Sequence, residues 1–143
     1  MNNENNFGNK NNPLVDVILP NYNKGIFLEE AINSVVDQTY KNWKLYIIDD
    51  SSDDNSPQII NKFSNLKNIK IVKLKKNKGP SFCRNYAMRI SDGKYISFID
   101  SDDTWTKNKL EKQIYFMENN NLTFSFTDYI PFFENNGIKK FKK

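Results

Sequence analysis

Short apolar runs recur along the chain and are separated by segments with a different hydrophobic spacing. The runs are rich in Val, Ile, Leu, Phe and Tyr, and several end at proline, aspartate or asparagine, which is typical of buried β-strands. The predicted strands cover residues 14–19, 45–48, 69–74, 95–99 and 122–127. The first is expected to stop at Pro20, and the second to end at Asp49 and Asp50.

Between these runs, apolar residues recur at three- and four-residue intervals, which indicates amphipathic helices. The predicted helices cover residues 26–38, 56–63, 80–90 and 110–117. Ser56 followed by Pro57 is an expected helix start, and Pro80 opens a helix in the same way. Gly93 is expected to end the helix that Pro80 begins.

Strands that alternate with helices across short links predict βαβ units. The expected fold is therefore α/β, with an open, mostly parallel sheet that has helices on both faces. Right-handed crossovers bring the carboxyl ends of parallel strands to the same edge of a sheet. Polar clusters lie at four such ends, and we expect them to converge on one crevice: residues 20–23, 49–50, 77–79 and 100–103.

The length of 143 residues is suited to a single domain. We expect an Asn-rich, disordered lead-in at 1–12, the folded domain at 13–130 and a basic tail at 131–143. The single cysteine argues against a disulfide framework, and the absence of histidine excludes His-based catalysis and the usual zinc sites. No apolar stretch is long enough for a membrane span or resembles a signal peptide, so a cytoplasmic location is predicted.

The distribution of charge is more informative than the net charge of +4. No acidic residue lies between Asp54 and Asp92, whereas lysine and arginine are frequent there. Such a stretch could attract nucleic acid, an anionic membrane or a phosphate ligand, or it could be a solvated lysine surface. Nucleic acid is the least favoured of these partners, because aromatic residues are not interleaved with the lysines.

Three carboxylates within four positions, Asp100, Asp102 and Asp103, follow the predicted strand at 95–99. Like charges this close need compensation, and Mg²⁺ or Mn²⁺ takes oxygen ligands that it shares with substrate phosphates. The carboxyl end of a strand in an open α/β sheet is also where such folds bind ligands. An ordinary acidic loop is the alternative, so the interpretation depends on the rest of the chain.

Several segments in order resemble the family 2 glycosyltransferases, which have the nucleotide-sugar-binding fold called GT-A. The resemblance covers residues 14–130, and its motifs are Val17-Ile-Leu-Pro-Asn-Tyr-Asn23, Gln38-Thr-Tyr40, Ile47-Ile-Asp-Asp-Ser-Ser-Asp53, Asn77-Lys-Gly79, Arg84-Asn85 and Gly93-Lys-Tyr-Ile-Ser-Phe-Ile-Asp-Ser-Asp-Asp103, followed by Trp105 and Lys109-Leu110. It implies that the first part of such an enzyme, the donor-binding part, is present.

The resemblance also implies roles for individual residues. Asp50 would accept a hydrogen bond from the uracil N3–H, or it could be a turn aspartate that caps the next loop. Tyr22 would pack along the base, or it could be a half-buried core tyrosine. Arg84 would approach the ribose or diphosphate, or it could be a solvated residue on a helix face. Pro20, Asn23 and Ser101 complete the predicted nucleotide-binding set.

For the metal, the resemblance implies Asp102 as a direct ligand, while Asp100 would contact the ribose or the metal shell. Asp103 is expected to cap a helix near residues 104–109, although it could join the metal shell. Cys83 stands where the family often has alanine, and it is interpreted as a small core residue.

The implied reaction is inverting transfer of a sugar from a UDP-sugar to a hydroxyl acceptor, with a glycan or lipid-linked acceptor and a role in cell-surface polysaccharide synthesis. The catalytic base is unknown, because nothing after Thr127 resembles the family's base and members are usually longer. The alternative is a catalytically incomplete fragment that only binds a nucleotide sugar. A response-regulator receiver is disfavoured, because its acidic pair follows the first strand. Peripheral association with the inner face of the membrane and self-association are also expected.

Overall fold

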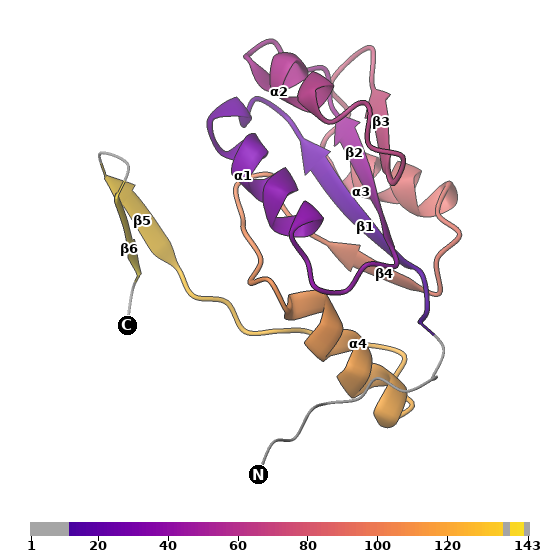
Figure 1. The fold of residues 1–143 in the computed structure, drawn as a ribbon. Helices are drawn as coiled ribbons and strands as arrows, with labels where there is room; N and C mark the ends of the chain where they lie inside the picture. The colour runs from indigo at the N-terminus through magenta and orange to yellow at the C-terminus, as the bar shows by residue number, and fades with distance from the viewer. Residues whose placement is uncertain (1–11, 136–137, 142–143) are drawn as a thin grey trace.

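The computed structural model describes residues 12–135 and 138–141, in which strands and helices alternate as predicted (Figure 1). The elements are β1 (Val15–Asn21), α1 (Gly25–Val36), β2 (Trp43–Asp49), α2 (Ser56–Lys62), β3 (Ile69–Lys73), α3 (Pro80–Arg89), β4 (Tyr95–Phe98), α4 (Lys109–Asn119), β5 (Phe132–Asn135) and β6 (Ile138–Phe141). The first four strands form one sheet in the order β3-β2-β1-β4. All its pairings are parallel, so the predicted α/β sheet is confirmed.

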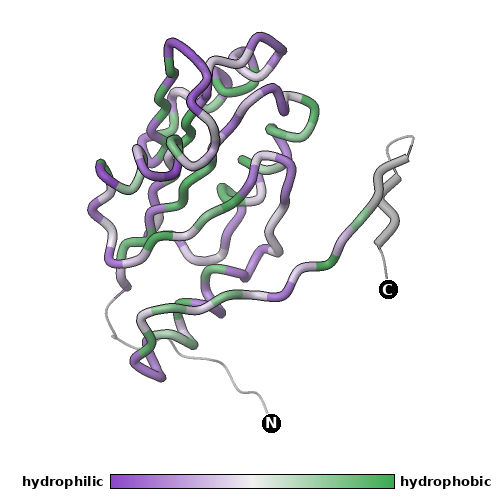
Figure 2. The backbone as a smooth tube through the Cα atoms, turned by 180° about the vertical axis from the view of Figure 1, so that it is seen from behind, coloured by the Kyte–Doolittle hydropathy of each residue, from purple (hydrophilic) through white to green (hydrophobic). Residues whose placement is uncertain are grey.

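Helices cover both faces of this sheet. Side chains at successive strand positions point to opposite faces, so apolar residues of one strand pack against helices on both sides. Val15, Val17 and Leu19 of β1 pack with apolar residues of α1, α2 and α4 in the larger core cluster. Ile18 packs on the other face with Cys83 and Ala87 of α3. Figure 2 shows the hydrophobic segments gathered in the strands between these helices. Among the described residues, no helix is both long and apolar enough to cross a bilayer.

The prediction of a strand at 122–127 is wrong. This segment is irregular, and the side chains of Phe124 and Phe126 are 76% and 82% exposed. Its alternating apolar pattern resembles a strand, but a strand also needs a neighbour for its backbone N–H and C=O groups. No described strand pairs with the outer side of β4, which is an edge of the sheet. The chain instead leaves the domain in an extended path (Figures 1 and 2).

The predicted basic tail contains an antiparallel hairpin made by β5 and β6. The hairpin stands at the end of the extended segment, away from the four-stranded sheet (Figure 1). At the other end of the chain, the predicted disordered lead-in lies outside the described residues except for Asn12. The main-chain oxygen of Asn12 accepts a hydrogen bond of 2.5 Å from the side chain of Asn42.

Gly93 does not end α3, which stops at Arg89 with Ile90 as its C-cap. Gly93 is needed because the chain passes against Asp16 of β1, where a Cβ would lie 3.0 Å from the Asp16 Cγ. The buried Asp16 carboxylate accepts hydrogen bonds from the main-chain N–H groups of Asp92 and Gly93, at 2.8 and 2.7 Å. Asp16 thereby fixes the start of β4, a role that its position within an apolar run did not reveal.

The buried amide of Gln38 connects the end of α1 to the start of α4. Its Nε2 donates to the main-chain oxygens of Ser34 and Thr106, at 2.9 and 2.8 Å. Its Oε1 accepts a hydrogen bond of 2.9 Å from the main-chain N–H of Leu110. Thr106 and Leu110 follow the acidic cluster at 100–103, so Gln38 holds the segment that leaves this cluster.

Replacement of Gln38 by alanine should lower the free energy of unfolding by about 2–4 kcal/mol, because it leaves buried main-chain groups without partners. Gln58→Ala is the matched control, since Gln58 is exposed on α2. That variant should stay within about 0.5 kcal/mol of the parent protein. Urea unfolding followed by circular dichroism measures both. Equal, small changes in the two variants would show that the Gln38 amide does not anchor α4.

Candidate functional site

A cavity of about 500 Å³ lies at the carboxyl ends of β1, β2 and β4, beside the start of α3. Its lining residues are Pro20, Asn21, Tyr22, Lys24, Asp50, Asn77, Gly79, Pro80, Cys83, Arg84, Asp100, Ser101 and Asp102. All four polar clusters that the sequence placed at this edge contribute to it, so their predicted convergence is confirmed. Except for Asn23, the predicted nucleotide-binding and metal-binding residues line this cavity.

The loop after β1 is held by the loop after β2. The buried Asn21 side chain donates to the Asp49 carboxylate at 2.9 Å and to the Ser52 hydroxyl at 3.1 Å. Asn23, in the left-handed region with φ 52°, exchanges two hydrogen bonds with Asp53, at 2.6 and 2.9 Å. Asn23 therefore shapes the wall of the cavity from outside rather than lining it.

Gly25 begins α1 at a point where an added Cβ would require the Asn55 side chain to move. A Cβ there would lie 1.7 Å from the Asn55 Oδ1. The main-chain N–H of Gly25 instead donates to Asp54 Oδ2 at 2.8 Å, and that of Ser56 donates to Asp54 Oδ1 at 2.8 Å. Burial works in the opposite direction, but the hydrogen bonds from Ser56 and Gly25 lower the pKa of Asp54. Asp54 therefore ties the starts of α1 and α2 together as a carboxylate.

Asp50 is buried at the end of β2 and holds the loop before α3. Its two carboxylate oxygens accept hydrogen bonds from the main-chain N–H groups of Lys78 and Gly79, at 2.8 and 2.7 Å. The turn is completed by Gly79, whose φ of +86° suits glycine. The loop-capping alternative for Asp50 is thus realised. It leaves further acceptor positions on both oxygens, because each has two lone pairs.

Tyr22 and Arg84 both lie at the cavity, and neither takes the purely structural role that the sequence left open for it. Tyr22 lies at the cavity with 46% of its surface exposed and belongs to neither core cluster, so it is not a core tyrosine. Arg84 is not a freely solvated helix residue, because its guanidinium donates to Asp100 Oδ1 at 2.5 Å across the cavity wall. This ion pair connects α3 to the acidic turn that follows β4.

Asp102, another acidic side chain at the cavity, is also paired with a cation. The Lys24 ammonium lies 2.8 Å from Asp102 Oδ2, and the two residues are 78 positions apart in the chain. The sequence analysis missed Lys24. The signal that could have found it is its place directly after Asn21-Tyr22-Asn23, in the loop that follows the first strand.

Asp103 does not cap a helix, because α4 begins only at Lys109 and residues 104–106 are irregular. Its main-chain N–H closes a turn by donating to the Asp100 carbonyl at 3.0 Å. Burial, with the negative charges of Asp100 and Asp102, raises the pKa of Asp103. The turn is therefore a region of concentrated negative charge.

The carboxylates of this turn suit a hard divalent cation. Asp100 and Asp102 offer carboxylate oxygens at the cavity, the ligands that Mg²⁺ and Mn²⁺ prefer. Within residues 12–135, no group of three or more acidic, cysteine or histidine side chains converges to hold a metal. A cation bound here would accordingly take its remaining ligands from water and from a bound phosphate, as is usual for Mg²⁺.

A second cavity of about 350 Å³ lies at the opposite end of β4, between that strand and the end of α4. Its carboxylate, Glu118, already accepts hydrogen bonds from Lys94 at 2.6 Å and from the hydroxyl of Tyr95. These contacts join β4 to α4. In the first cavity, by contrast, charged groups from several loops come together.

Cys83 is buried at the base of the first cavity and packs with Ile18 and Ala87. Burial, together with the nearby charge of Asp50, raises the pKa of its thiol to about 11. A thiol in this state is a poor nucleophile, because the thiolate is the reactive form. The interpretation of Cys83 as a small core residue is confirmed.

The fold is that of the GT-A glycosyltransferases. Among solved structures, residues 1–349 of TarS from S. aureus, in complex with UDP-GlcNAc, superpose with a TM-score of 0.70 and 32% identity, over 73% of this chain and 31% of that TarS chain. The family model for glycosyl transferase family 2 matches residues 16–143. The chain belongs to this family.

Named relatives agree with this assignment. A glycosyltransferase of Bacillus subtilis, TuaG, described as a putative teichuronic acid biosynthesis enzyme, is 42% identical over 118 residues, covering 82% of this chain and 47% of TuaG. WfgD of Escherichia coli, a UDP-Glc:alpha-D-GlcNAc-diphosphoundecaprenol beta-1,3-glucosyltransferase, is 40% identical over 128 residues, covering 90% of this chain and 50% of WfgD. The chain spans about half the length of these two curated relatives.

The raised pKa of Cys83 predicts slow thiol chemistry in the folded protein. At pH 8 its thiolate fraction should be roughly a hundredfold below that of an ordinary cysteine, and burial slows the reaction further. The rate of reaction with an aromatic disulfide reagent, followed by absorbance, should therefore be at least roughly a hundredfold lower in buffer than in urea. It should also keep rising with pH up to about 11. Equal rates in buffer and urea would contradict this account.

Proposed function

We propose that this chain binds the nucleoside diphosphate part of a UDP-sugar and serves the inverting transfer of the sugar to a hydroxyl acceptor. The product would be a cell-surface polysaccharide or glycoconjugate. The observation that carries the proposal is the convergence of Tyr22, Asp50, Arg84, Asp100 and Asp102 on one cavity of about 500 Å³. Similarity to TarS, which was solved with UDP-GlcNAc, supports the donor class.

Uracil recognition is assigned to Tyr22 and Asp50. Tyr22 offers an exposed ring face, and stacking of a base on an aromatic side chain contributes about 1–3 kcal/mol. Asp50 is oriented by the N–H groups of Lys78 and Gly79, and its remaining lone pairs can accept from the uracil N3–H. A base that presents a hydrogen-bond acceptor in place of the uracil N3–H would not bind the Asp50 carboxylate, because both groups are acceptors.

The diphosphate is assigned to the side of the cavity where cations and carboxylates meet. Arg84 has a planar fork that can retain Asp100 and also bind a phosphate oxygen. Asp102 and Asp100 would hold Mn²⁺ or Mg²⁺, which when bound supplies positive charge to the leaving diphosphate. Pro20 and Ser101 form the cavity wall between these groups.

In the proposed reaction, the bond between the anomeric carbon and the β-phosphate oxygen breaks as an acceptor oxygen attacks from the opposite face. The diphosphate leaves with the bonding electron pair, and Arg84 stabilises its developing charge. The acceptor hydroxyl gives its proton to a general base. Among the described residues, no carboxylate is assigned this role, and the proposal concerns the donor side of the reaction.

We also propose a peripheral location at the inner face of the membrane. WfgD, by its name, acts on a diphosphoundecaprenol-linked sugar, and this supports a lipid-linked acceptor. The surface that suits an anionic membrane is the edge formed by β3 and the loop after it, here called the basic edge: Lys70, Lys73, Lys75, Lys76 and Lys78. All five side chains are exposed, and none forms an ion pair with a described carboxylate.

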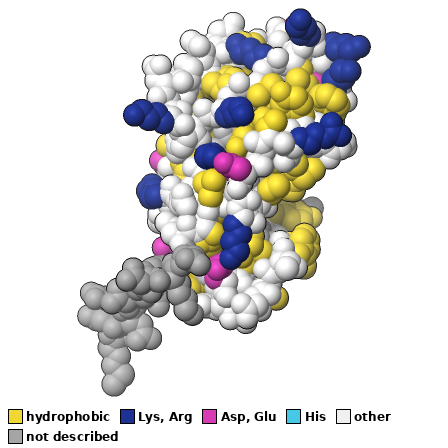
Figure 3. Space-filling view, turned by 90° about the vertical axis from the view of Figure 1, so that its right-hand side faces the viewer, with side chains coloured by type: hydrophobic (Ala, Val, Ile, Leu, Met, Phe, Trp, Pro, Cys, Tyr) yellow, Lys and Arg dark blue, Asp and Glu magenta, His cyan; other side chains and the backbone are white. Residues whose placement is uncertain are grey.

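Apolar side chains accompany these lysines. The ring of Phe82, in the first turn of α3, is 40% exposed, and the Lys78 ammonium lies 5.4 Å from its centre. Figure 3 shows lysine and arginine side chains around exposed hydrophobic surface on the side of the molecule where β3 and α3 lie. This combination favours an anionic lipid surface, which attracts cations and accepts apolar side chains.

Self-association is proposed for a different surface. Phe124, Phe126 and Ile130 are 76%, 82% and 68% exposed on the extended segment after α4. Apolar patches of this kind favour association.

Nucleotide selectivity tests the proposed function. UDP should bind more tightly than ADP or GDP in the presence of Mn²⁺, as measured by calorimetry, because Asp50 is placed to accept the uracil N3–H. Adenine presents an acceptor at the corresponding edge, and guanine carries its N1–H donor on a larger ring system than uracil. Tyr22→Ala should weaken UDP binding roughly tenfold through lost stacking. Tyr129→Ala is the control, since Tyr129 is 86% exposed and does not line the cavity.

Equal affinities for the three diphosphates would remove the uracil role of Asp50. Release of UDP from UDP-sugars, measured on the same sample with and without acceptors, then separates an enzyme from a binding fragment. Binding with no turnover would favour the fragment.

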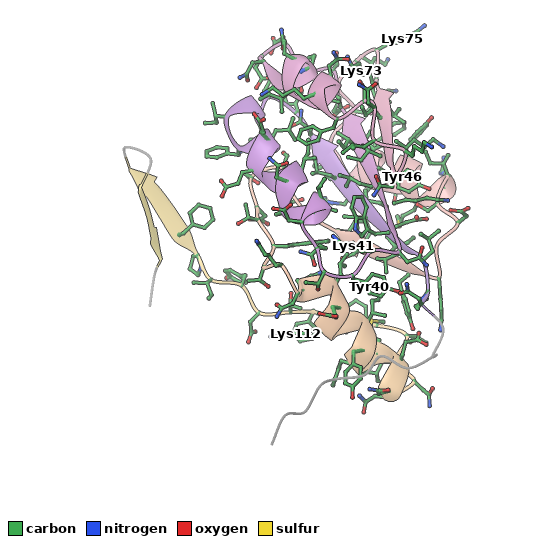
Figure 4. The ribbon with its side chains drawn as sticks, viewed as in Figure 1. Tyr40, Lys41, Tyr46, Lys73, Lys75 and Lys112 are labelled. Carbon is green, nitrogen blue, oxygen red and sulfur yellow. The ribbon has the colours of Figure 1, made fainter. Side chains whose placement is uncertain are left out.

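Charge reversal tests the membrane proposal. The double variant Lys73→Glu with Lys75→Glu should lose roughly tenfold or more in binding to vesicles with anionic lipid, since each lysine contributes about 1 kcal/mol there. Lys41→Glu with Lys112→Glu makes the same change in net charge on the side of the molecule near α4 (Figure 4). Vesicle co-sedimentation measures both. Equal loss in the two double variants would mean that net charge alone, rather than the basic edge, governs binding.

A further inference from the structure

We infer that Lys24 occupies the place of the divalent cation in the metal-free protein, and that cation binding displaces its ammonium from Asp102 toward the donor diphosphate. This inference rests on the proposed function, because it concerns the same cavity. It makes Lys24 a positioning residue that couples the metal to the nucleotide.

The geometry places the lysine where a cation is needed. Lys24 Nζ lies 2.8 Å from Asp102 Oδ2, and both residues line the cavity. A cation held by the same carboxylate would approach the ammonium closely, and two positive charges this close repel each other. The ammonium must therefore move when a divalent ion binds to Asp102.

The backbone around Lys24 is fixed, so the side chain is the part that can move. The Lys24 carbonyl accepts hydrogen bonds from the N–H groups of Phe27 and Leu28, at 2.9 and 3.0 Å. Its neighbours Asn23 and Gly25 are bound to Asp53 and Asp54. The flexible stem of lysine can swing its ammonium to another part of the cavity while the Cα stays in place.

The ion pair is also weak enough to exchange. The side chains of Lys24 and Asp102 are 44% and 41% exposed, and pairs of this exposure contribute about 0–1 kcal/mol to stability. Arg84 and Asp100 form the second pair, in which the arginine side chain is 31% exposed. Its fork can keep Asp100 while another of its N–H groups binds phosphate, so Arg84 need not leave. Lys24 is accordingly the exchangeable cation.

The experiment measures Mn²⁺ binding to the full chain without nucleotide, from the free-Mn²⁺ signal in electron paramagnetic resonance. Lys24→Met should bind Mn²⁺ roughly threefold to tenfold more tightly than the parent protein, because the competing charge is gone. Lys62→Met is the matched control: Lys62 forms an ion pair of the same length, 2.8 Å, with Glu29, and neither residue lines the cavity. Its Mn²⁺ affinity should be unchanged.

A second arm tests where the ammonium goes. In saturating Mn²⁺, Lys24→Met should bind UDP several-fold more weakly than the parent, whereas Lys24→Arg should keep most of the affinity. Asp102→Ala should abolish the Mn²⁺ binding that Lys24→Met enhances. Urea unfolding of Lys24→Met should show a near-parental midpoint, as expected for an exposed pair.

Equal Mn²⁺ affinities of the parent and Lys24→Met, or no Mn²⁺ binding by either, would overturn the inference and leave the pair as a structural salt bridge. Unchanged UDP affinity in Lys24→Met would overturn the movement toward the diphosphate. Tighter Mn²⁺ binding with no UDP binding by any variant would instead count against the proposed function, while the exchange at Asp102 would stand.

Discussion

The site depends on carboxylates that each accept two main-chain hydrogen bonds from a neighbouring loop. Asp50 binds the N–H groups of Lys78 and Gly79, Asp54 those of Gly25 and Ser56, and Asp16 those of Asp92 and Gly93, all at 2.7–2.8 Å. Hydrogen bonds to an ionised acceptor are roughly twice as strong as neutral ones. Such pairs can therefore hold loops that have few apolar contacts. The segments held by Asp50 and Asp54 carry residues of the cavity wall, among them Gly79 and Lys24, whereas Asp16 fixes the start of β4 at the opposite end of the sheet.

The acidic turn after β4 is the other electrostatic problem in this fold. Its charges come together because Ser101 is buried and Asp103 closes a turn onto Asp100. Lys24, in the loop before α1, and Arg84, on α3, compensate two of the carboxylates from separate parts of the chain. Each of these ion pairs is partly exposed, so it stabilises the turn modestly and remains available for exchange with a ligand.

Among the residues that the structure describes, no strand pairs with the outer side of β4. Ile96 and Phe98 of this edge strand are 40% and 46% exposed, and the segment after α4 presents Phe124 and Phe126. Exposed apolar residues at an unpaired edge are unusual in an isolated domain. They are consistent with the fact that the chain spans about half the length of its curated relatives TuaG and WfgD.

The order of the strands and helices along the chain was predictable from the sequence, because the apolar runs and helical spacings are local signals. The convergence of Tyr22, Asp50 and Asp102 was predictable as well, since parallel strands place their carboxyl ends together. The segment 122–127 was predicted wrongly, because a strand depends on a partner that the pattern of one segment cannot supply. The tertiary structure alone decided the pairing of Lys24 with Asp102 and the close passage of Gly93 past Asp16. In each case the partners are more than 70 positions apart in the chain, and only the packing of β1 beside β4 brings them together.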